Sequence, residues 1–319
     1  MPEARFGGKR SKNEMEPFFS IIIVCFQAGE ELSRTVESVR MQTDGDFEIL
    51  VKDGGSTDDS IGHLPKDARI RLFQEKDSGI YDAMNQAAGR VRGHYVLFLN
   101  CGDYLYDKEV LAGVRKAAEG VLSDSGKPTV GIKDARSGMD NGARIGEPAG
   151  RSRPVIFYGN TYERKTQSVV MSNPKLDAFG CYRNIPCHQS CFYPAELIRP
   201  EQLRKRGRER TYEPHYRVRA DYEHFLWCFF RAKAQTVYVP LTVCSYEGGG
   251  FSESKENRAV AKKEHRAITA LYMTQKERLR YRAILLLTLA PLRTYLARSR
   301  WFSGLYQGIK RILYRRRAK

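Results

Sequence analysis

An apolar run that ends in polar residues constrains the fold of this chain more than any other feature. Residues 95–99 (YVLFL) are aliphatic or aromatic, and Asn100, Gly102 and Asp103 follow them. So short a run is typical of a buried parallel strand that emerges at its carboxyl end. Ligands of open α/β sheets collect at such strand ends, so the sequence predicts a site at residues 100–103. The structural alternative is an ordinary turn.

A helix is predicted just before this strand. Small apolar residues recur at helical spacing after Gly79, which predicts a helix that begins there with Asp77 or Ser78 as its N-cap. Asp82 and Asn85 are three residues apart and therefore share one helical face. The structural alternative for Asp82 is that it only complements the helix dipole.

Strand and helix signals alternate along the first third of the chain. Apolar runs rich in β-branched residues predict strands at 18–26, 47–52, 70–74 and 94–99, and helical spacing predicts a helix at 30–42. The second of these strands ends in Asp53, two glycines and a Ser/Thr/Asp cluster that would cap a following helix. This alternation predicts an α/β fold, with a mostly parallel central sheet and helices on both faces.

Two common nucleotide-binding motifs are absent from the sequence. There is no GxGxxG after the first predicted strand and no GxxxxGK[ST] anywhere, so neither a dinucleotide fold nor a P-loop is indicated. Acidic residues stand at the strand ends instead. Because phosphate is anionic, carboxylates suit a nucleotide site only where they bind ribose and base, or hold a divalent cation that bridges to the phosphates. This pattern favours a metal-assisted nucleotide-sugar site.

Basic residues are concentrated near the C-terminus. The net charge is +17, and residues 251–319 contain 18 Lys and Arg but only 4 Asp and Glu. Leucines and aromatics among these cations predict amphipathic helices that lie on an anionic membrane surface. The apolar run at 283–292 is too short to span a bilayer. The alternative is that the apolar residues of this basic region pack against the catalytic domain and that its charges form a solvated face.

The expected domain organisation has three parts. Residues 1–16 are polar and predict a disordered leader without a secretion signal, so the catalytic part is expected to face the cytoplasm. Residues 17–250 form the predicted catalytic domain, with 119–153 as an insertion or loop. Residues 251–319 form the basic helical tail. The seven cysteines show no CxxC spacing and are expected to be reduced thiols.

Three ordered segments resemble a known family. They are DGGSTD at 53–58, DSGIYDAMN at 77–85 and FLNCGD at 98–103. Together they resemble the nucleotide-binding half of inverting family-two glycosyltransferases, which have the GT-A fold. The resemblance covers about residues 18–110 and continues more weakly to about residue 250. It implies that Asp53 contacts the nucleotide base or ribose, and that the nucleotide pocket is lined by Asp77, Asp82 and Asn85.

The third segment departs from the family pattern. A DxD motif usually stands there, and its carboxylates hold Mg or Mn against the donor diphosphate. This chain has Asn100, Gly102 and Asp103 instead, similar to an Asn-x-Gly-Asp branch among exopolysaccharide and lipid-linked sugar transferases. The resemblance therefore implies a divalent cation with Asp103 as its ligand. The amide oxygen of Asn100 would coordinate more weakly.

The second half of the chain carries the remaining candidates. Residues 186–194 resemble the family's His-Gln-aromatic segment, which implies donor-binding roles for His188 and Gln189. A lone histidine is otherwise usually a hydrogen-bonded core residue. The glycine-rich segment containing Gly249 resembles the family's loop that closes over the diphosphate.

Inverting sugar transfer also requires a general base. One carboxylate must take the proton of the acceptor hydroxyl. The resemblance assigns this base to Asp221, with Glu223 as the second candidate, and the structural alternative for Asp221 is an N-cap.

The sequence thus predicts an inverting transferase that moves a sugar from a nucleotide-diphosphate donor to a hydroxyl of a lipid-linked glycan in polysaccharide biosynthesis. It would be peripheral on the inner face of the cytoplasmic membrane. Two alternatives remain open. A catalytically silent scaffold with this fold would explain the incomplete DxD. A nucleic-acid-binding protein would explain the net charge, but the nearly neutral body argues against it, and no nucleic-acid partner is expected.

Overall fold

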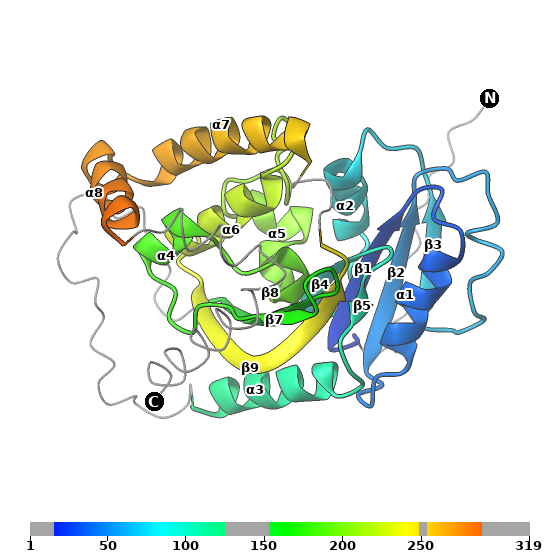
Figure 1. The fold of residues 1–319 in the computed structure, drawn as a ribbon. Helices are drawn as coiled ribbons and strands as arrows, with labels where there is room; N and C mark the ends of the chain where they lie inside the picture. Colours follow the sequence, from blue (N-terminus) through cyan, green and yellow to red (C-terminus); the bar gives the residue numbers. More distant parts are fainter. Residues whose placement is uncertain (1–15, 125–152, 249–253, 289–319) are drawn as a thin grey trace.

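The structure, a computed structural model, describes residues 16–124, 153–248 and 254–288 (Figure 1). Its strands are β1 Phe19–Cys25, β2 Phe47–Asp53, β3 Ile70–Gln74, β4 Tyr95–Asn100, β5 Tyr104–Leu105, β6 Val155–Glu163, β7 Ser168–Val170, β8 Cys191–Pro194 and β9 Gln235–Tyr246. Its α-helices are α1 Glu30–Arg40, α2 Ile80–Ala88, α3 Val110–Asp124, α4 Ala178–Arg183, α5 Pro200–Arg204, α6 Ala220–Phe230, α7 Lys255–Tyr272 and α8 Gln275–Leu287. Two short 3-10 helices, η1 His188–Ser190 and η2 Ala195–Leu197, flank β8.

A central mixed sheet organises the described residues. Its strand order is β3-β2-β1-β4-β8-β6-β9-β5, and β7 pairs with β6 outside this path (Figure 1). The first four strands of this order are parallel, as predicted. β8 runs antiparallel to both β4 and β6, while β6 and β9 are parallel. The α/β prediction is confirmed, and the sheet is parallel in its N-terminal half and mixed beyond β4.

Alternate residues of the strands build two cores, one on each face of the sheet. β1 is buried along its whole length because helices cover both of its faces. Ile22 faces a cluster that includes residues of α2 and α6, while Ile21 and Ile23 face a cluster that includes residues of α1 and α3. This double burial explains the continuous apolar runs of the sequence.

The strand order reverses between β1 and β4. From β1 the chain proceeds outward through β2 to β3, and it then returns to place β4 on the other side of β1. The carboxyl ends of β1 and β4 therefore lie side by side, with Val24 opposite Asn100. In open α/β sheets such a reversal creates a crevice for ligands.

Several local predictions were wrong. Residues 54–69, all of which the structure describes, form turns, so the polar cluster after Asp53 caps no helix. The N-cap of α2 is Gly79, and neither Asp77 nor Ser78 takes that position. Gly79 has a φ of 133°, a backbone angle that residues with a side chain rarely adopt. Glycine therefore suits the N-cap of α2.

One further boundary differs from the prediction. Residues 119–124, expected to be loop, complete α3, and the rest of the expected insertion up to residue 152 lies outside the described residues. Residues 237–246 belong to the single long strand β9. The seven cysteines are all free, as expected.

The helix α7, expected to be part of a separate tail, belongs to the folded body. Ile268 and Met273 are buried in the same cluster as Phe225 of α6. The Glu264 carboxylate accepts hydrogen bonds of 2.7, 3.1 and 2.9 Å from three consecutive backbone N–H groups at residues 217–219, just before α6. For α7, the alternative that the apolar residues of the basic region pack against the catalytic domain is therefore correct.

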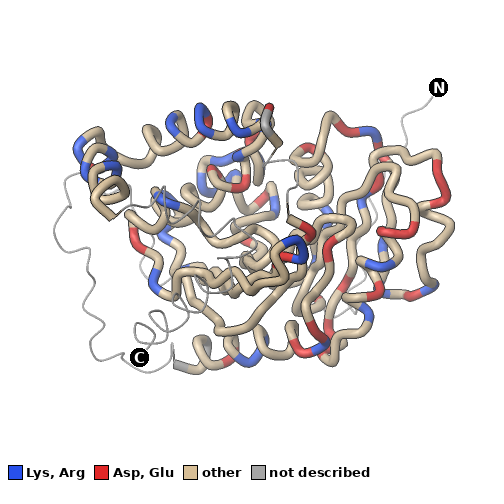
Figure 2. Tube along the Cα trace, in the orientation of Figure 1, with Lys and Arg blue, Asp and Glu red and all other residues tan. Residues whose placement is uncertain are grey.

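The helix α8 is much more exposed. None of its described side chains is buried, and the exposed fractions of Leu279 and Leu287 are 59% and 83%. Of the helices that the structure describes, none is both long and apolar enough to cross a bilayer. Lys and Arg recur along α7 and α8 (Figure 2). Residues 289–319 lie outside the described part of the chain.

We expect Gly93→Ala to destabilise the fold. A Cβ at Gly93 would lie 2.7 Å from the backbone carbon of Phe19 and 2.7 Å from the backbone nitrogen of Ser20, and backbone cannot move aside as a side chain can. The free energy of unfolding should fall by about 2 kcal/mol or more. Gly45→Ala is the matched control, because a Cβ there meets nothing within 4 Å. Equal urea midpoints for the two variants would contradict this packing.

Candidate functional site

A cavity of about 2370 Å³ opens where β1 and β4 end. Its lining includes residues 24–28, which end β1 and follow it, and residues 100–104, which end β4 and lead into β5. Other parts of the lining come from the first turns of α2 and α6, from η1, and from α7 and α8. The crevice predicted by the strand order is thus a real cavity, and elements far apart in sequence enclose it.

A buried glutamine organises the end of β4. The Gln189 side chain accepts a hydrogen bond from the Asn100 backbone N–H (2.7 Å) and donates one to Asp103 Oδ2 (2.8 Å). Asp103 Oδ1 accepts from the Glu247 backbone N–H (3.1 Å) and lies 3.3 Å from an Arg164 guanidinium nitrogen. Burial raises the pKa of Asp103 in spite of these donors. Gln189 therefore orients the one carboxylate that remains from the expected DxD.

The residues at this strand end fit a cation that is shared with a ligand. Asn100 Oδ1 is buried and has no hydrogen-bond partner. With the Asp103 carboxylate it offers two hard oxygen donors, the type that Mg and Mn prefer. In the described part of the chain, no group of three or more His, Cys, Asp or Glu side chains could hold a metal ion by itself. Mg sites often use one or two carboxylates and complete the shell with substrate phosphates and water.

Asp221 lies in the cavity with two partners. It is in the first turn of α6, whose N-cap is Arg219, so the N-cap alternative for Asp221 is wrong. Its Oδ2 lies 3.5 Å from His188 Nδ1, and its Oδ1 lies 3.0 Å from the Tyr81 hydroxyl.

Opposing effects set the protonation of this pair. Burial raises the pKa of Asp221, but the neighbouring His188 and Arg219 lower it by more, so its pKa lies below the ordinary value. Burial lowers the pKa of His188, but the Asp221 carboxylate raises it by more, so its pKa lies above the ordinary value. Asp221 is therefore an ionised carboxylate at neutral pH, with a side chain that is 23% exposed. His188 Nε2 is buried without a hydrogen-bond partner.

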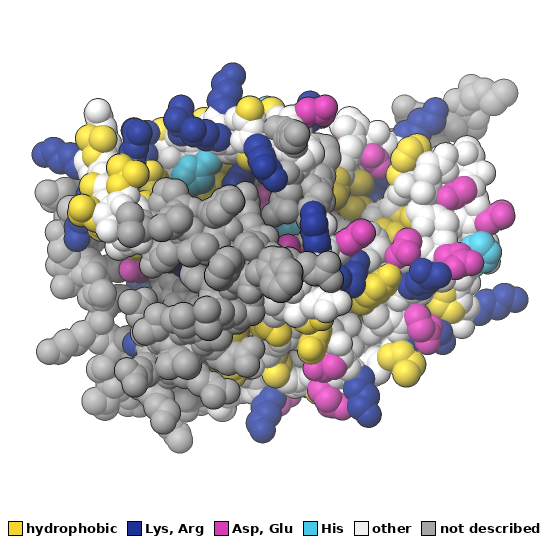
Figure 3. Space-filling model, in the orientation of Figure 1, with side chains coloured by type: hydrophobic (Ala, Val, Ile, Leu, Met, Phe, Trp, Pro, Cys, Tyr) yellow, Lys and Arg dark blue, Asp and Glu magenta, His cyan; other side chains and the backbone are white. Residues whose placement is uncertain are grey.

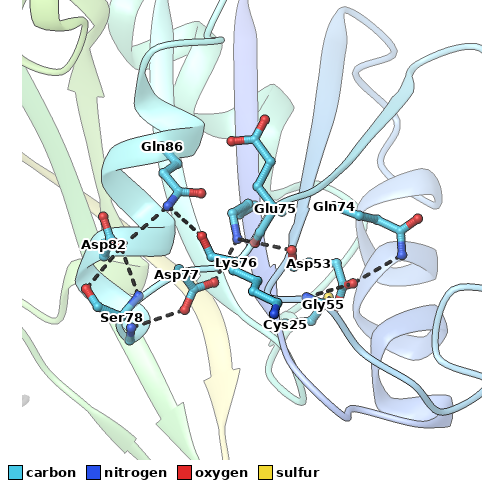
Figure 4. A network of polar contacts seen from close by, with 12 residues as sticks. Cys25, Asp53, Gly55, Gln74, Glu75, Lys76, Asp77, Ser78, Asp82 and Gln86 are labelled. Carbon is cyan, nitrogen blue, oxygen red and sulfur yellow. Dashed lines mark hydrogen bonds and ion pairs between the residues drawn. The ribbon is translucent and has the colours of Figure 1, made fainter. Parts of the chain in front are cut away.

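Asp53 and Asp77 are not part of the cavity lining. Figure 4 shows both in a network of polar contacts within the protein. Asp53 is fully buried and accepts hydrogen bonds from the backbone N–H groups of Gly55 (3.1 Å) and Ser56 (2.9 Å), which hold the loop after β2. Asp77 Oδ2 pairs with the buried Lys52 ammonium at 2.7 Å. Both carboxylates are thus engaged by the protein itself.

Asp82 and Asn85 also have partners within the protein. Asp82 Oδ2 accepts hydrogen bonds from the Ser78 backbone N–H (2.9 Å) and the Ser78 hydroxyl (3.0 Å), which closes the first turn of α2 (Figure 4). Asn85 exchanges two hydrogen bonds of 2.8 Å with the backbone of Tyr212. Neither residue lines the cavity. Gly249 lies outside the described residues.

Glu223, the second candidate for the base, points elsewhere. The residue is 3% exposed, and its carboxylate forms a two-pronged ion pair with Arg208, at 3.1 and 2.6 Å. The Tyr272 hydroxyl of α7 donates a hydrogen bond to the same carboxylate. Glu223 does not line the cavity, so of the two candidates only Asp221 does.

Sequence reasoning missed several residues of the cavity. Tyr81 lies in the segment 77–85 that resembles the family, but nothing in the sequence links it to Asp221. Phe26 directly follows β1 and is a lining residue of the cavity. Its exposed fraction is 64%. The sequence predicts a separate tail where α7 and α8 in fact supply cations to the cavity lining. The spacing of four residues between Arg258, Lys262 and Arg266 could have indicated this, because it places all three on one helical face.

Comparison with known proteins shows the family. Residues 20–169 match the sequence profile of Glycosyl transferase family 2. The PGL/p-HBAD biosynthesis glycosyltransferase of Mycobacterium bovis (strain BCG / Pasteur 1173P2) is 31% identical over 244 residues, which cover 75% of this chain and 80% of that protein. An uncharacterized glycosyltransferase of Mycobacterium tuberculosis (strain ATCC 25618 / H37Rv) is 28% identical over 251 residues, covering 76% and 80% of the two chains.

Solved structures show the same fold. Residues 1–349 of S. aureus TarS, in complex with UDP-GlcNAc, superpose with a TM-score of 0.56 at 15% identity, covering 84% of this chain and 71% of that one. The mannosyltransferase PcManGT from Pyrobaculum calidifontis, in complex with GDP-Man and Mn²⁺, gives a TM-score of 0.52 at 16% identity, covering 95% and 84%. The chain therefore belongs to glycosyltransferase family 2 and is a transferase with the GT-A fold.

Proposed function

We propose that this protein is an inverting glycosyltransferase that moves a sugar from a nucleotide-diphosphate donor to an acceptor hydroxyl, with Asp221 as the general base. The observation that carries the proposal is the Asp221 carboxylate, held by His188 and Tyr81, in the same cavity as Asn100 and Asp103. A base and a diphosphate site that share one cavity are what a single displacement requires.

Asp221 suits the task of a general base. As the acceptor oxygen attacks the sugar carbon, the bond to the leaving diphosphate breaks and the hydroxyl proton passes to the carboxylate. A carboxylate can accept that proton only if it is ionised beforehand. His188 and Tyr81 contact different oxygens of Asp221 and limit its rotation, so the carboxylate keeps one orientation toward the cavity.

The donor would occupy the end of the cavity formed by β1 and β4. Phe26 offers an exposed ring on which a nucleotide base could stack. Donor-binding roles for Asn100, Asp103, His188 and Gln189 agree with their place in the lining. The expected roles of Asp53, Asp77, Asp82 and Asn85 become indirect, since these residues hold the loops and helix that border the donor site. The role of Gly249 stays a prediction.

A divalent cation forms part of the proposal. PcManGT, which shares the fold, was solved with GDP-Man and Mn²⁺. Here Asn100 Oδ1 and the Asp103 carboxylate would hold the cation together with the donor diphosphate. When bound, such an ion neutralises the charge that develops on the leaving diphosphate.

The proposed acceptor is a lipid-linked glycan presented at the anionic inner face of the cytoplasmic membrane. α8 exposes leucines next to cationic residues, as helices at membrane surfaces do. Residues 289–319 add nine Lys and Arg and no Asp or Glu. This composition supports peripheral attachment on the cytoplasmic side.

We expect Asp221→Asn to reduce turnover by about a hundredfold or more, because it removes the proton acceptor. Donor affinity should stay nearly unchanged, since Asp221 acts on the acceptor. The measurement is release of nucleoside diphosphate from a panel of nucleotide sugars, with donor binding followed by titration. Glu119→Gln, an exposed change on α3 outside the cavity lining, is the control. If Asp221→Asn keeps more than about a tenth of wild-type turnover, the base has been misassigned.

We expect Asp103→Ala and Asp53→Ala both to weaken donor binding, with only Asp103→Ala changing its dependence on Mn²⁺. The physical reason is that Asp103 would contact the ion, whereas Asp53 holds a loop. Asn100→Asp should tighten Mn²⁺ binding, because it adds a second carboxylate. Calorimetric titration of donor with Mn²⁺ or with a chelator measures these effects. The same metal response in Asp53→Ala and Asp103→Ala would refute the division of roles.

We expect the full chain to pellet with anionic vesicles and to be released by high salt, because the attraction is electrostatic. Truncation after Thr288 should strongly reduce pelleting, because it removes nine cations and leaves only α8 to contact the membrane. This end point keeps α7, whose Ile268 and Met273 belong to the core. Neutral vesicles are the control for lipid charge. Equal pelleting of the truncated form, or binding that ignores lipid charge, would rule out membrane attachment through residues 289–319.

A further inference from the structure

The outer side of the cavity is lined by cations. We call this surface the α7–α8 wall: Arg258, Lys262 and Arg266 of α7, with Arg278 and Arg282 of α8. Figure 3 shows basic side chains gathered over α7 and α8, whereas acidic and basic side chains are mixed over β1–β3 and α1. The acidic residues of the cavity lining, Glu31, Asp103, Asp221 and Glu247, all come from other elements. Among the described lining residues, α7 and α8 contribute no carboxylate.

The spacing within the wall is unfavourable for the protein alone. Arg258, Lys262 and Arg266 follow one another at four-residue intervals, and so do Arg278 and Arg282. Like charges at this spacing repel each other on a helix. Within the described residues, none of Lys262, Arg266, Arg278 and Arg282 forms an ion pair with a carboxylate. In the described part of the chain, no ion pair therefore offsets the repulsion between Lys262 and Arg266 or between Arg278 and Arg282.

Two arginines of the lining have a buried nitrogen atom that lacks an acceptor. The Nε atoms of Arg278 and Arg219 are both buried, and neither has a hydrogen-bond partner. Buried donors are normally satisfied, so such atoms mark a place where an acceptor group is missing. Arg219 immediately precedes the first turn of α6, which carries Asp221. One unsatisfied donor thus belongs to the wall, and the other lies two residues before the proposed base in the sequence.

The wall is too long to serve only the donor diphosphate. Arg258 and Arg266 are eight residues apart, which is about 12 Å along a helix. α8 then continues the cationic lining beyond the end of α7. Figure 1 shows α7 running from the side of α2 toward α8, away from β1–β3. The far end of the wall therefore offers cations to a second anionic group, distinct from the donor diphosphate.

We propose that Arg278 and Arg282, together with Arg266, bind a phosphate group carried by the acceptor. This inference rests on the proposed function, because it assigns the acceptor to this end of the cavity. The acceptor would be a phosphate or diphosphate ester, and binding of its anion would hold its hydroxyl at Asp221. Two sources share this chemistry: the phosphate of a lipid carrier, and a phosphorylated sugar.

The test compares two double variants with equal loss of charge. Arg278→Gln/Arg282→Gln removes cations that line the cavity, and Lys276→Gln/Arg280→Gln removes exposed cations of the same helix outside the lining. The full chain is titrated calorimetrically with n-octyl phosphate, with glucose 1-phosphate and with neutral n-octyl glucoside, each with UDP present. Thermal melting checks both folds, and the single variant Arg282→Gln, at an exposed position, replaces the first double variant if that variant unfolds.

We expect a phosphate probe to bind the wild type, and Arg278→Gln/Arg282→Gln to weaken this binding by about tenfold or more. The control pair should change it little. Tighter binding of octyl phosphate than of glucose 1-phosphate assigns the anion to a lipid carrier, and the reverse order assigns it to a phosphorylated sugar. Octyl glucoside binding as tightly as octyl phosphate would overturn the proposal, as would equal weakening in both double variants.

Two further measurements distinguish an acceptor-phosphate site from a donor site and from a membrane-binding surface. UDP is titrated alone: if Arg278→Gln/Arg282→Gln weakens UDP binding as much as phosphate binding, the wall serves the donor and the acceptor assignment fails. If UDP and nucleotide sugars do not bind at all while phosphate binding still requires Arg278 and Arg282, the donor function fails and the anion site stands. If both double variants lose vesicle pelleting equally while neither changes phosphate binding, the cations are a membrane surface, and the subsite is overturned.

Discussion

The pairing of β1 with β4 is the constraint on which the rest of the site depends. It places Val24 next to Asn100 and so joins two strand ends that are 76 positions apart in the chain. Because both strands are buried on both faces, their backbones cannot shift without disturbing two cores. The position at which ligands bind follows from this pairing, and every other group of the site is placed relative to it.

Neighbouring side chains orient the two carboxylates near these strand ends, and burial and nearby charges shift their pKa values in opposite directions. Asp103 is oriented by Gln189, and Asp221 by Tyr81 and His188. Burial alone would favour the neutral form of both carboxylates, and this effect prevails at Asp103, whereas the cationic surroundings prevail at Asp221. Two carboxylates in one cavity thus differ in their affinity for protons. Asp221 has the lower pKa and so is in the ionised form that a proton acceptor requires.

α7 links the catalytic body to the basic end of the chain. Its Glu264 binds the backbone just before α6, while the Tyr272 hydroxyl reaches the buried Glu223. The cationic residues of α7 that line the cavity are therefore held on a rigid element. The positive charge of the C-terminal region then has two separable uses: the α7–α8 wall faces the cavity, and residues 289–319 remain for the membrane role that we propose.

The sequence by itself determined the parallel half of the sheet, the position of the site at the end of β4, and the family. Periodicity and strand-end chemistry are local properties, so they are readable without tertiary contacts. Only the tertiary structure decided which acidic residues face the cavity. Asp53, Asp77 and Glu223 look as reactive in sequence as Asp221, but Ser56, Lys52 and Arg208 engage them. The partner of a carboxylate can lie anywhere in the chain, so its role depends on contacts that only folding creates.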